Sequence, residues 1–189
     1  MKAVKAGLEE LTVLTEIISG VKEEETSNLV EEIMKANRVF IGGAGRSLLS
    51  MKGFAMRLMH VKHITYLVGE VCTPSVQPGD LLIVASGRGT TKVTLDLVRK
   101  AKSHGARTAV LTMHPDAPIP QTCDLVLTIP ETPAVKVQDS EELSFAKVNL
   151  PGNFPELAIS VVLDGVIAEL MGCENTDGAV LNFMHANLE

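Results

Sequence analysis

RVFIGGAGRS, residues 38–47, decides the fold, because a short run of β-favouring residues ends in glycines and a helical pattern follows directly. DLLIVASGRGTT, residues 80–91, repeats this arrangement. Further β-rich runs occur at residues 64–69, 106–113 and 124–129, and helical patterns at residues 47–60 and 90–104. Strands that alternate with helices favour right-handed βαβ crossovers, so the pattern predicts an α/β fold with a parallel sheet.

Helical patterns flank this series on both sides. Residues 1–36 indicate two helices, and residues 153–171 and 177–187 indicate two more. The first of the C-terminal pair is apolar almost all round, so we expect it to be buried against the sheet or in a subunit interface. Residues 130–151 lack periodicity and predict a loop. We predict one domain over residues 1–189, with N-terminal helices at 1–36, a βαβ core at 37–130 and C-terminal helices at 153–189.

Composition and charge limit the class of protein. Hydrophobic residues make up 46% of the 189 residues but aromatic residues only 3%, so the core must consist largely of aliphatic side chains, as in buried parallel strands. The formal net charge of −6 argues against a nucleic acid or an anionic membrane as the main partner. A local basic pocket for one phosphate remains compatible with that charge.

The cysteines and the N-terminal segment bear on location. Cys72, Cys123 and Cys173 are far apart and form no CxxC pair, which fits reduced thiols better than a disulfide framework or a zinc site. Residues 1–20 alternate charged and apolar residues at helical spacing, unlike a signal peptide or a membrane span. We therefore expect a cytoplasmic protein that does not bind a membrane.

Two turns at predicted strand ends combine glycines, hydroxyl side chains and one arginine each. The Gly42 turn covers residues 42–47, and the Ser86 turn covers residues 86–91. Glycines and helix N-termini at the carboxyl ends of parallel strands present N–H groups to anions. One such turn would more simply be an ordinary βα turn whose hydroxyls cap a helix, but two of them favour an anion site. The candidate ligands of this anion are Arg46, Ser47, Ser86, Gly87, Arg88, Gly89, Thr90 and Thr91.

Nucleotide binding is a weaker interpretation of these turns. The residues from Gly43 begin like the dinucleotide motif GxGxxG, but Leu48 stands where the third glycine belongs. A dinucleotide would also leave the Ser86 turn without a role. The Gly-Lys-Ser/Thr of a Walker A motif does not occur in the sequence.

Acid–base groups are needed if the anion is a sugar phosphate whose carbonyl moves along the chain. Glu156 begins a strongly apolar helix, where it could be the base or could merely pair favourably with the helix N-terminus. His185 lies near the C-terminus and could equally be a solvated helix-end residue. His60 and His63 form an HxxH pair, but they straddle a predicted helix end without an evident third ligand, so we predict no metal.

Five segments carry a resemblance to a known family: RVFIGGAGRS, FAMRLMH, the turn after DLLIVASG, LDGVIAELM and the terminal HANLE. They resemble, in the same order, segments of the 6-phospho-3-hexuloisomerases of the sugar isomerase (SIS) superfamily. We expect a homotetramer or homodimer that needs no cofactor. The resemblance implies a five-stranded parallel sheet flanked by helices, usually assembled as a tetramer. It also implies the interconversion of 3-hexulose 6-phosphate and fructose 6-phosphate, as in the ribulose monophosphate pathway of formaldehyde fixation.

The resemblance assigns roles to individual positions. It implies that Ser47 and the Ser86 turn hold the phosphate of the sugar. Glu156 corresponds to the carboxylate that moves a proton between C2 and C3 through an enediolate. His185 and His60 correspond to candidate acids or ring-opening groups.

The chain departs from the family pattern at three positions. Arg88 and Thr90 replace the second serine and the glutamate of the usual Ser-Gly-Ser-Gly-Glu-Thr turn, and Pro155 replaces an aromatic residue before the acid. These departures leave two alternatives open. One is an isomerase for another phosphosugar, and the other is a non-catalytic protein that senses sugar phosphates.

Overall fold

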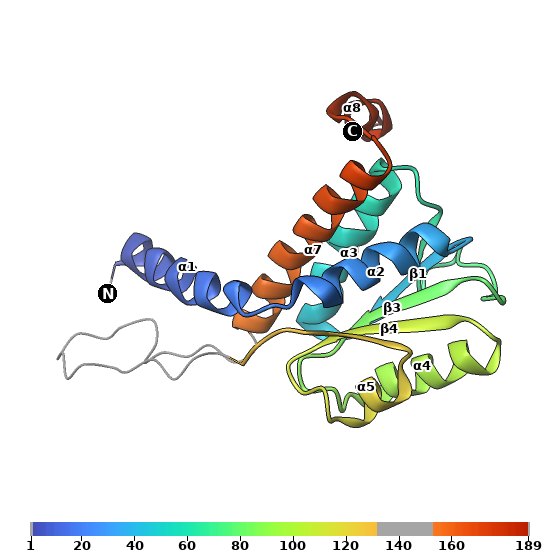
Figure 1. Ribbon diagram of the computed structural model, residues 1–189, viewed down its shortest axis with the longest axis horizontal. Helices are drawn as coiled ribbons and strands as arrows, with labels where there is room; N and C mark the ends of the chain where they lie inside the picture. Colours follow the sequence, from blue (N-terminus) through green and yellow to red (C-terminus); the bar gives the residue numbers. More distant parts are fainter. Residues whose placement is uncertain (1, 132–152, 189) are drawn as a thin grey trace.

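A computed structural model of the protein describes residues 2–131 and 153–188, so most of the loop expected at residues 130–151 lies outside the described residues. A five-stranded parallel sheet forms its centre, in the order β2-β1-β3-β4-β5 (Figure 1). All five strands lie within the runs that the sequence predicted, although β2 is only three residues long. The strands are β1 (Val39–Gly43), β2 (Thr65–Leu67), β3 (Leu81–Ala85), β4 (Arg107–Thr112) and β5 (Leu125–Thr128).

Helices cover both faces of the sheet, as the predicted βαβ alternation requires (Figure 1). The helices on one face are α2 (Glu23–Lys35), α3 (Gly45–His60) and α7 (Asn153–Cys173). The helices on the other face are α4 (Lys92–Ser103) and the short α5 (Pro118–Thr122). Helix α5 was not predicted from the sequence, because five residues are too few to show a helical period.

Alternation of side chains along the strands builds two cores. Val39 and Ile41 of β1 pack into the larger core beneath α2, α3 and α7, whereas Phe40 between them faces the smaller core beneath α4 and α5. The same alternation places Ile83 in the larger core and Leu82 in the smaller one. Both faces of the sheet are therefore buried, which explains why the core residues are mostly aliphatic.

The apolar helix α7 is buried largely within the chain, by contacts with α3, α1 and α2. Its inward face carries aliphatic residues such as Ile159, Leu163 and Leu170, which are no more than 1% exposed. Val161, on another side of the helix, is 49% exposed. The expected burial of this helix is thus met mainly by neighbouring helices of the same chain.

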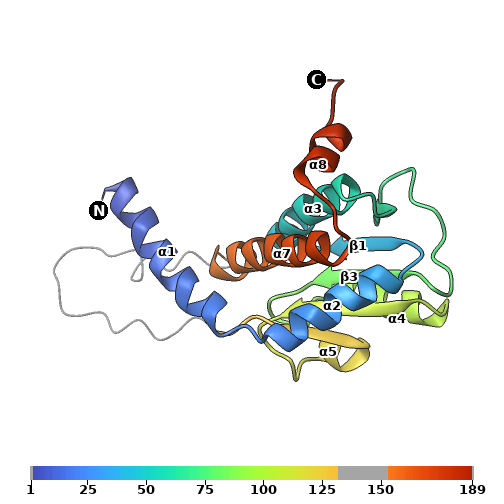
Figure 2. The same ribbon diagram turned by 45° about the horizontal axis from the view of Figure 1, so that its top comes forward.

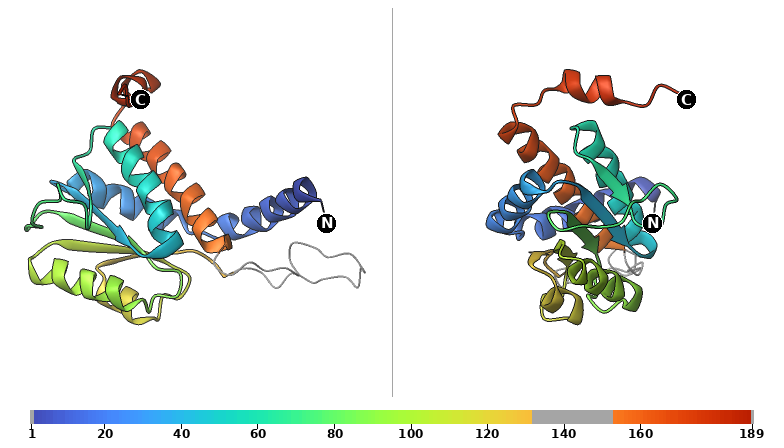
Figure 3. Two further views of the ribbon diagram at one scale, coloured as in Figure 1. Left: turned by 180° about the vertical axis from the view of Figure 1, so that it is seen from behind. Right: turned by 90° about the vertical axis from the view of Figure 1, so that its right-hand side faces the viewer.

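The two terminal helices extend away from the sheet. Helix α1 (Ala3–Ser19) projects from the rest of the molecule, whereas α8 (Gly178–Met184) stands beyond the C-terminal ends of α3 and α7 (Figures 2 and 3). Within the part of the chain that the structure describes, no helix is long and apolar enough to span a bilayer.

Candidate active site

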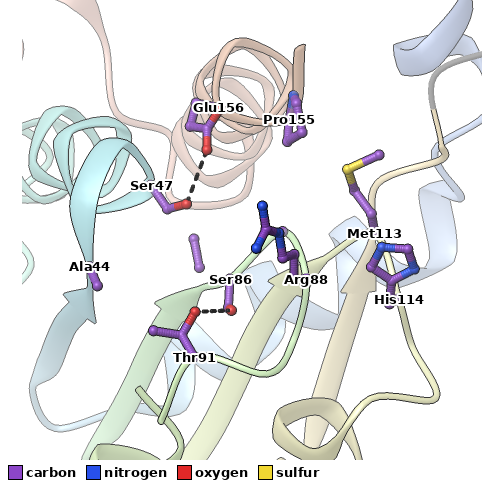
Figure 4. A pocket seen from close by; sticks show the side chains of 11 residues that line it. Ala44, Ser47, Ser86, Arg88, Thr91, Met113, His114, Pro155 and Glu156 are labelled. Atoms are coloured by element: carbon purple, nitrogen blue, oxygen red, sulfur yellow. Dashed lines mark hydrogen bonds between the residues drawn. The ribbon is translucent and has the colours of Figure 1, made fainter. Parts of the chain in front are cut away.

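A pocket of about 390 Å³ lies at the carboxyl ends of β1, β3 and β4, where parallel sheets commonly bind ligands (Figure 4). Each of its walls comes from a turn that follows a strand, or from the first turn of α7. The lining residues are Ala44, Ser47, Ala85, Ser86, Gly87, Arg88, Thr91, Met113, His114, Pro155 and Glu156.

The Ser86 turn presents hydroxyl groups at the N-terminus of α4. Ser86 is 3% exposed, and its Oγ lies 3.2 Å from Oγ1 of Thr91, the residue that precedes the helix. The side chain of Thr91 does not cap α4. The first N–H groups of a helix have no carbonyl partner inside it and carry partial positive charge, so this turn can bind an anion.

The Ser86 turn is tied to the end of β4, to the residue after it and to α5 by three hydrogen bonds. The backbone N–H of Met113 and the hydroxyl of Thr112 both donate to the carbonyl of Gly87, over 3.0 and 3.3 Å. Further along, the N–H of Ile119 donates to the carbonyl of Gly89 over 3.0 Å. Gly89 has a φ of 65°, and a Cβ there would lie 2.5 Å from Cβ of Ala117. The glycine therefore permits both the backbone conformation and the close approach.

These hydrogen bonds bring Met113 and His114 to the pocket, although neither was among the predicted site residues. Their position at the end of a β-rich run was the only available signal, because ligand-binding residues gather at strand ends. Nothing in their local pattern distinguishes them from ordinary loop residues.

The Gly42 turn supplies the opposite wall. A Cβ on Gly42 would lie 2.5 Å from Cδ2 of Leu97, so a side chain here would require Leu97 of α4 to shift. Ser47, in the first turn of α3, is 9% exposed, and its Oγ donates to Oε1 of Glu156 over 3.4 Å. The backbone carbonyl of Glu156 accepts from Oγ of Ser50 at 3.0 Å, which anchors α7 to α3.

Glu156 carries the most unusual group of the pocket. Its Oε2 is buried, and no described residue gives that atom a hydrogen bond. Among the described residues the nearest cation is Arg46, whose Nε lies 3.8 Å away, a distance suited to an ion pair but too long for a hydrogen bond. A buried carboxylate oxygen without a hydrogen-bond partner is costly to the fold, so it is typical of a group retained for binding or chemistry.

Arg88 and Thr90, the two departures from the family turn, lie differently. The side chain of Arg88 extends into the pocket between Pro155 and His114 (Figure 4). Thr90 is exposed and does not line the pocket. Of the eight predicted anion ligands, the pocket thus brings together Ser47, Ser86, Gly87, Arg88 and Thr91.

The two histidines assigned by resemblance lie elsewhere in the chain. His60 ends α3 and is 3% exposed, and its ring stacks on that of His185 with centroids 5.5 Å apart. Burial lowers the pKa of His60, and His185 and Arg57 lower it further. Because 13 residues of helix separate His60 from Ser47, the pair lies about 20 Å from the pocket. A single chain therefore does not bring these histidines to the Ser86 turn.

The HxxH pair is not arranged for a metal. Nε2 of His63 lies 3.0 Å from Oε1 of Glu174, whereas His60 faces His185. Among the described residues, no three side chains of His, Cys, Asp or Glu are grouped so that they could hold a metal ion. Cys72, Cys123 and Cys173 are free thiols.

Comparison with known sequences identifies the class of protein to which this fold and pocket belong. Residues 32–146 match the SIS domain family, and the chain belongs to that family. Within it, the chain is 40% identical to the 3-hexulose-6-phosphate isomerase of Methylomonas aminofaciens over 93% of its length and 94% of that protein's. It is 35% identical to the 3-hexulose-6-phosphate isomerase of Bacillus subtilis over the full length of both chains.

Solved structures agree with this likeness. A protein of Methanococcus jannaschii, whose crystal structure was reported to infer a function as 3-hexulose-6-phosphate isomerase, has a TM-score of 0.79. It is 29% identical, and the alignment covers all of both chains.

Proposed function

We propose that the protein interconverts 3-hexulose 6-phosphate and fructose 6-phosphate through an enediolate. The similarity to 3-hexulose-6-phosphate isomerases along nearly the whole chain supports this substrate class. The observation that carries the chemistry is the buried Oε2 of Glu156, which has no hydrogen-bond partner among the described residues and lies beside an anion-binding turn. A carboxylate in that position can remove a proton next to a carbonyl.

The phosphate would bind at the Ser86 turn. Ser86 and Thr91 supply hydroxyl groups, α4 supplies the N–H groups of its first turn, and Arg88 supplies a guanidinium group. Ser47 faces this turn across the pocket (Figure 4). Anchoring the remote phosphate orients the sugar, so that its reacting carbons lie near Glu156.

Glu156 would then move the carbon-bound proton. It takes the proton from C2 of the 3-ketose, and the electron pair of that C–H bond forms the C2=C3 double bond of the enediolate. Return of the same proton to C3 leaves the carbonyl at C2. This chemistry needs no organic cofactor and no metal, because a carboxylate and the carbonyl of the sugar supply all the electron movement.

The proposal extends to the assembly and location of the protein. Val4, Leu8 and Leu11 are 59–77% exposed on the projecting part of α1, and burying them would favour an oligomer. We propose a homotetramer in the cytoplasm, as expected from the sequence. The roles suggested for His60 and His185 remain predictions, and in one chain the two rings contact each other away from the pocket.

The direct test is a coupled assay. The protein is given 3-hexulose 6-phosphate made enzymatically, and fructose 6-phosphate is followed through a dehydrogenase. Turnover that exceeds that of other ketose and aldose phosphates by about 10²-fold in kcat/KM supports the proposal, because a specific site discriminates at that level. Binding without turnover across the panel would instead indicate a sugar-phosphate sensor.

A further inference from the structure

The proposed reaction requires protons to move on oxygen as well as on carbon. When the C2=C3 double bond forms, the carbonyl oxygen on C3 must gain a proton, and the hydroxyl oxygen on C2 must later lose one. Glu156 is occupied with the carbon-bound proton during these steps. A second group that gives and takes protons near neutral pH is therefore needed, and this inference rests on the proposed function.

The pocket contains one group of that kind besides Glu156. Of the eleven described residues that line it, only Arg88, His114 and Glu156 carry ionisable side chains. A guanidinium group keeps its proton, so Arg88 can stabilise negative charge but cannot relay protons. Imidazole is the side chain best suited to exchange a proton near neutral pH.

The backbone of His114 is held in place beside the Ser86 turn. Its N–H donates to Oγ1 of Thr112 over 3.2 Å, and its carbonyl accepts from the N–H of Ala117 at 3.0 Å. The preceding residue, Met113, donates to the carbonyl of Gly87. His114 is thereby fixed relative to the turn that would hold the phosphate.

The ring of His114 has a carboxylate partner outside the pocket lining. Its Nδ1 lies 3.4 Å from Oε1 of Glu131, which follows β5. The attraction of this carboxylate orients the ring, so that Nδ1 faces Glu131 and Nε2 is left for exchange with a substrate. Both side chains are about half exposed or more, so this pair contributes little to stability.

We propose that His114 is the second catalytic residue, with Glu131 as the residue that positions it. As Glu156 removes the proton from C2, His114, protonated on both ring nitrogens, gives its Nε2 proton to the oxygen on C3. The π electrons of the C3=O bond form the new O–H bond, and His114 is left neutral with its Nδ1 proton. Nε2 next takes the proton from the hydroxyl on C2. The electrons of that O–H bond form the C2=O bond, and the C2=C3 electrons take the proton from Glu156 at C3.

The test compares His114→Asn with His104→Asn, which makes the same change at an exposed residue at the end of α4. His114→Asn is expected to lower kcat about 10²-fold, the usual contribution of a proton-transferring group, with fructose 6-phosphate binding within about threefold of the parent protein. His104→Asn should leave both quantities unchanged. Added imidazole should partly restore turnover to His114→Gly.

Glu131 needs a separate readout, since it acts through His114. Glu131→Gln is expected to lower kcat about tenfold at unchanged KM, and Glu131→Asp should recover part of this loss, as for other residues that orient a histidine. If the parent protein is active and His114→Asn retains at least a third of its kcat, the role of His114 is refuted. If the parent protein has no activity, the proposed function itself fails.

Discussion

Hydroxyl groups in the pocket are already oriented before a ligand binds. Ser86 is buried, and its Oγ lies 3.2 Å from that of Thr91 at the start of α4. Both residues are in a turn whose carbonyls at Gly87 and Gly89 accept hydrogen bonds from the segment after β4. Groups that are ordered in advance lose little entropy when they bind a phosphate.

Removing one of these hydroxyl groups should weaken substrate binding more than catalysis. Ser86→Ala deletes a hydrogen bond to a charged phosphate, worth about 1.5–3 kcal/mol, so KM should rise by about one to two orders of magnitude. The value of kcat should change little, because the phosphate is remote from the reacting carbons. Steady-state kinetics on Ser86→Ala and on the exposed Ser103→Ala would measure this, and equal KM values in the two variants would contradict it.

His60 should make the stability of the folded protein depend on pH, because its imidazole is buried. Burial lowers the pKa of His60 in the folded protein below the value of about 6.5 found in unfolded chains. The unfolded state therefore binds a proton more readily, so this stabilising contribution is present above about pH 6.5 and is lost as the pH falls through the folded pKa.

His60→Gln removes this titration. Between about pH 8 and pH 5, the melting temperature of the parent protein should fall more steeply than that of His60→Gln, because only the parent has an imidazole that is protonated more readily in the unfolded state. His104→Gln, at an exposed position, serves as the control. If the melting temperatures of the parent and of His60→Gln fall equally with pH across this range, the buried imidazole does not control stability in acid.

Turns and the short helix α5, rather than the strands, determine how the walls of the pocket are connected. Gly89 links the Ser86 turn to α5 through its carbonyl, and the backbone there has a φ of 65°. A side chain would meet Ala117 at 2.5 Å and the carbonyl of His114 at 3.3 Å. This one position therefore connects the turn of β3 with the segment that carries His114.

Gly89→Ala should reduce both stability and turnover. The added Cβ is strained by the positive φ and crowds α5, so unfolding should become easier by about 1–3 kcal/mol. Gly53→Ala is the matched control, because a Cβ there has nothing within 4 Å and lies in the exposed interior of α3. Alanine in such a helix should be neutral or stabilising by up to about 1 kcal/mol. Denaturant unfolding of both variants would check this, and equal stabilities would contradict it.

Sequence periodicity predicted the helices and strands better than it predicted the contacts between them. The strands and the helices α1, α2, α3, α4, α7 and α8 follow from local pattern. The contact between Ser47 and Glu156 spans 109 positions, and no local signal in either segment encodes it. The family resemblance, not the periodicity, placed these two residues in one site.

His114 shows where sequence reasoning ended. Its place in the pocket depends on hydrogen bonds between two loops, and loops carry no period that reveals such pairing. By contrast, the separation of His60 from Ser47 could have been inferred, because 13 residues of helix span about 20 Å. The family resemblance groups these residues by role, without regard to that length.

Helix α1 leaves the molecule as a whole with an exposed apolar surface. Its second half is anchored by Leu14 and Ile17, which are buried, whereas Leu8 and Leu11 of its first half are 61% and 59% exposed. Figure 3 shows this half extending beyond the sheet and its covering helices. Such a surface is typical of a subunit contact.

Charge on this surface should break up the proposed tetramer. Leu8→Glu together with Leu11→Glu places two carboxylates where an apolar contact is expected, so light scattering should detect smaller species than for the parent protein. Glu16→Gln, an exposed change on the same helix, should leave the assembly intact. A parent protein that is monomeric at micromolar concentration would contradict the proposed assembly.

The most direct test of the proposed mechanism is the turnover of Glu156→Gln with 3-hexulose 6-phosphate, beside Glu169→Gln on the same helix. We predict that Glu156→Gln loses at least about 10²-fold in kcat while it still binds fructose 6-phosphate, because the amide cannot accept the carbon-bound proton. Glu169→Gln should keep the activity of the parent protein. A folded Glu156→Gln variant that turns over within a few-fold of the parent would contradict the assignment of Glu156 as the base.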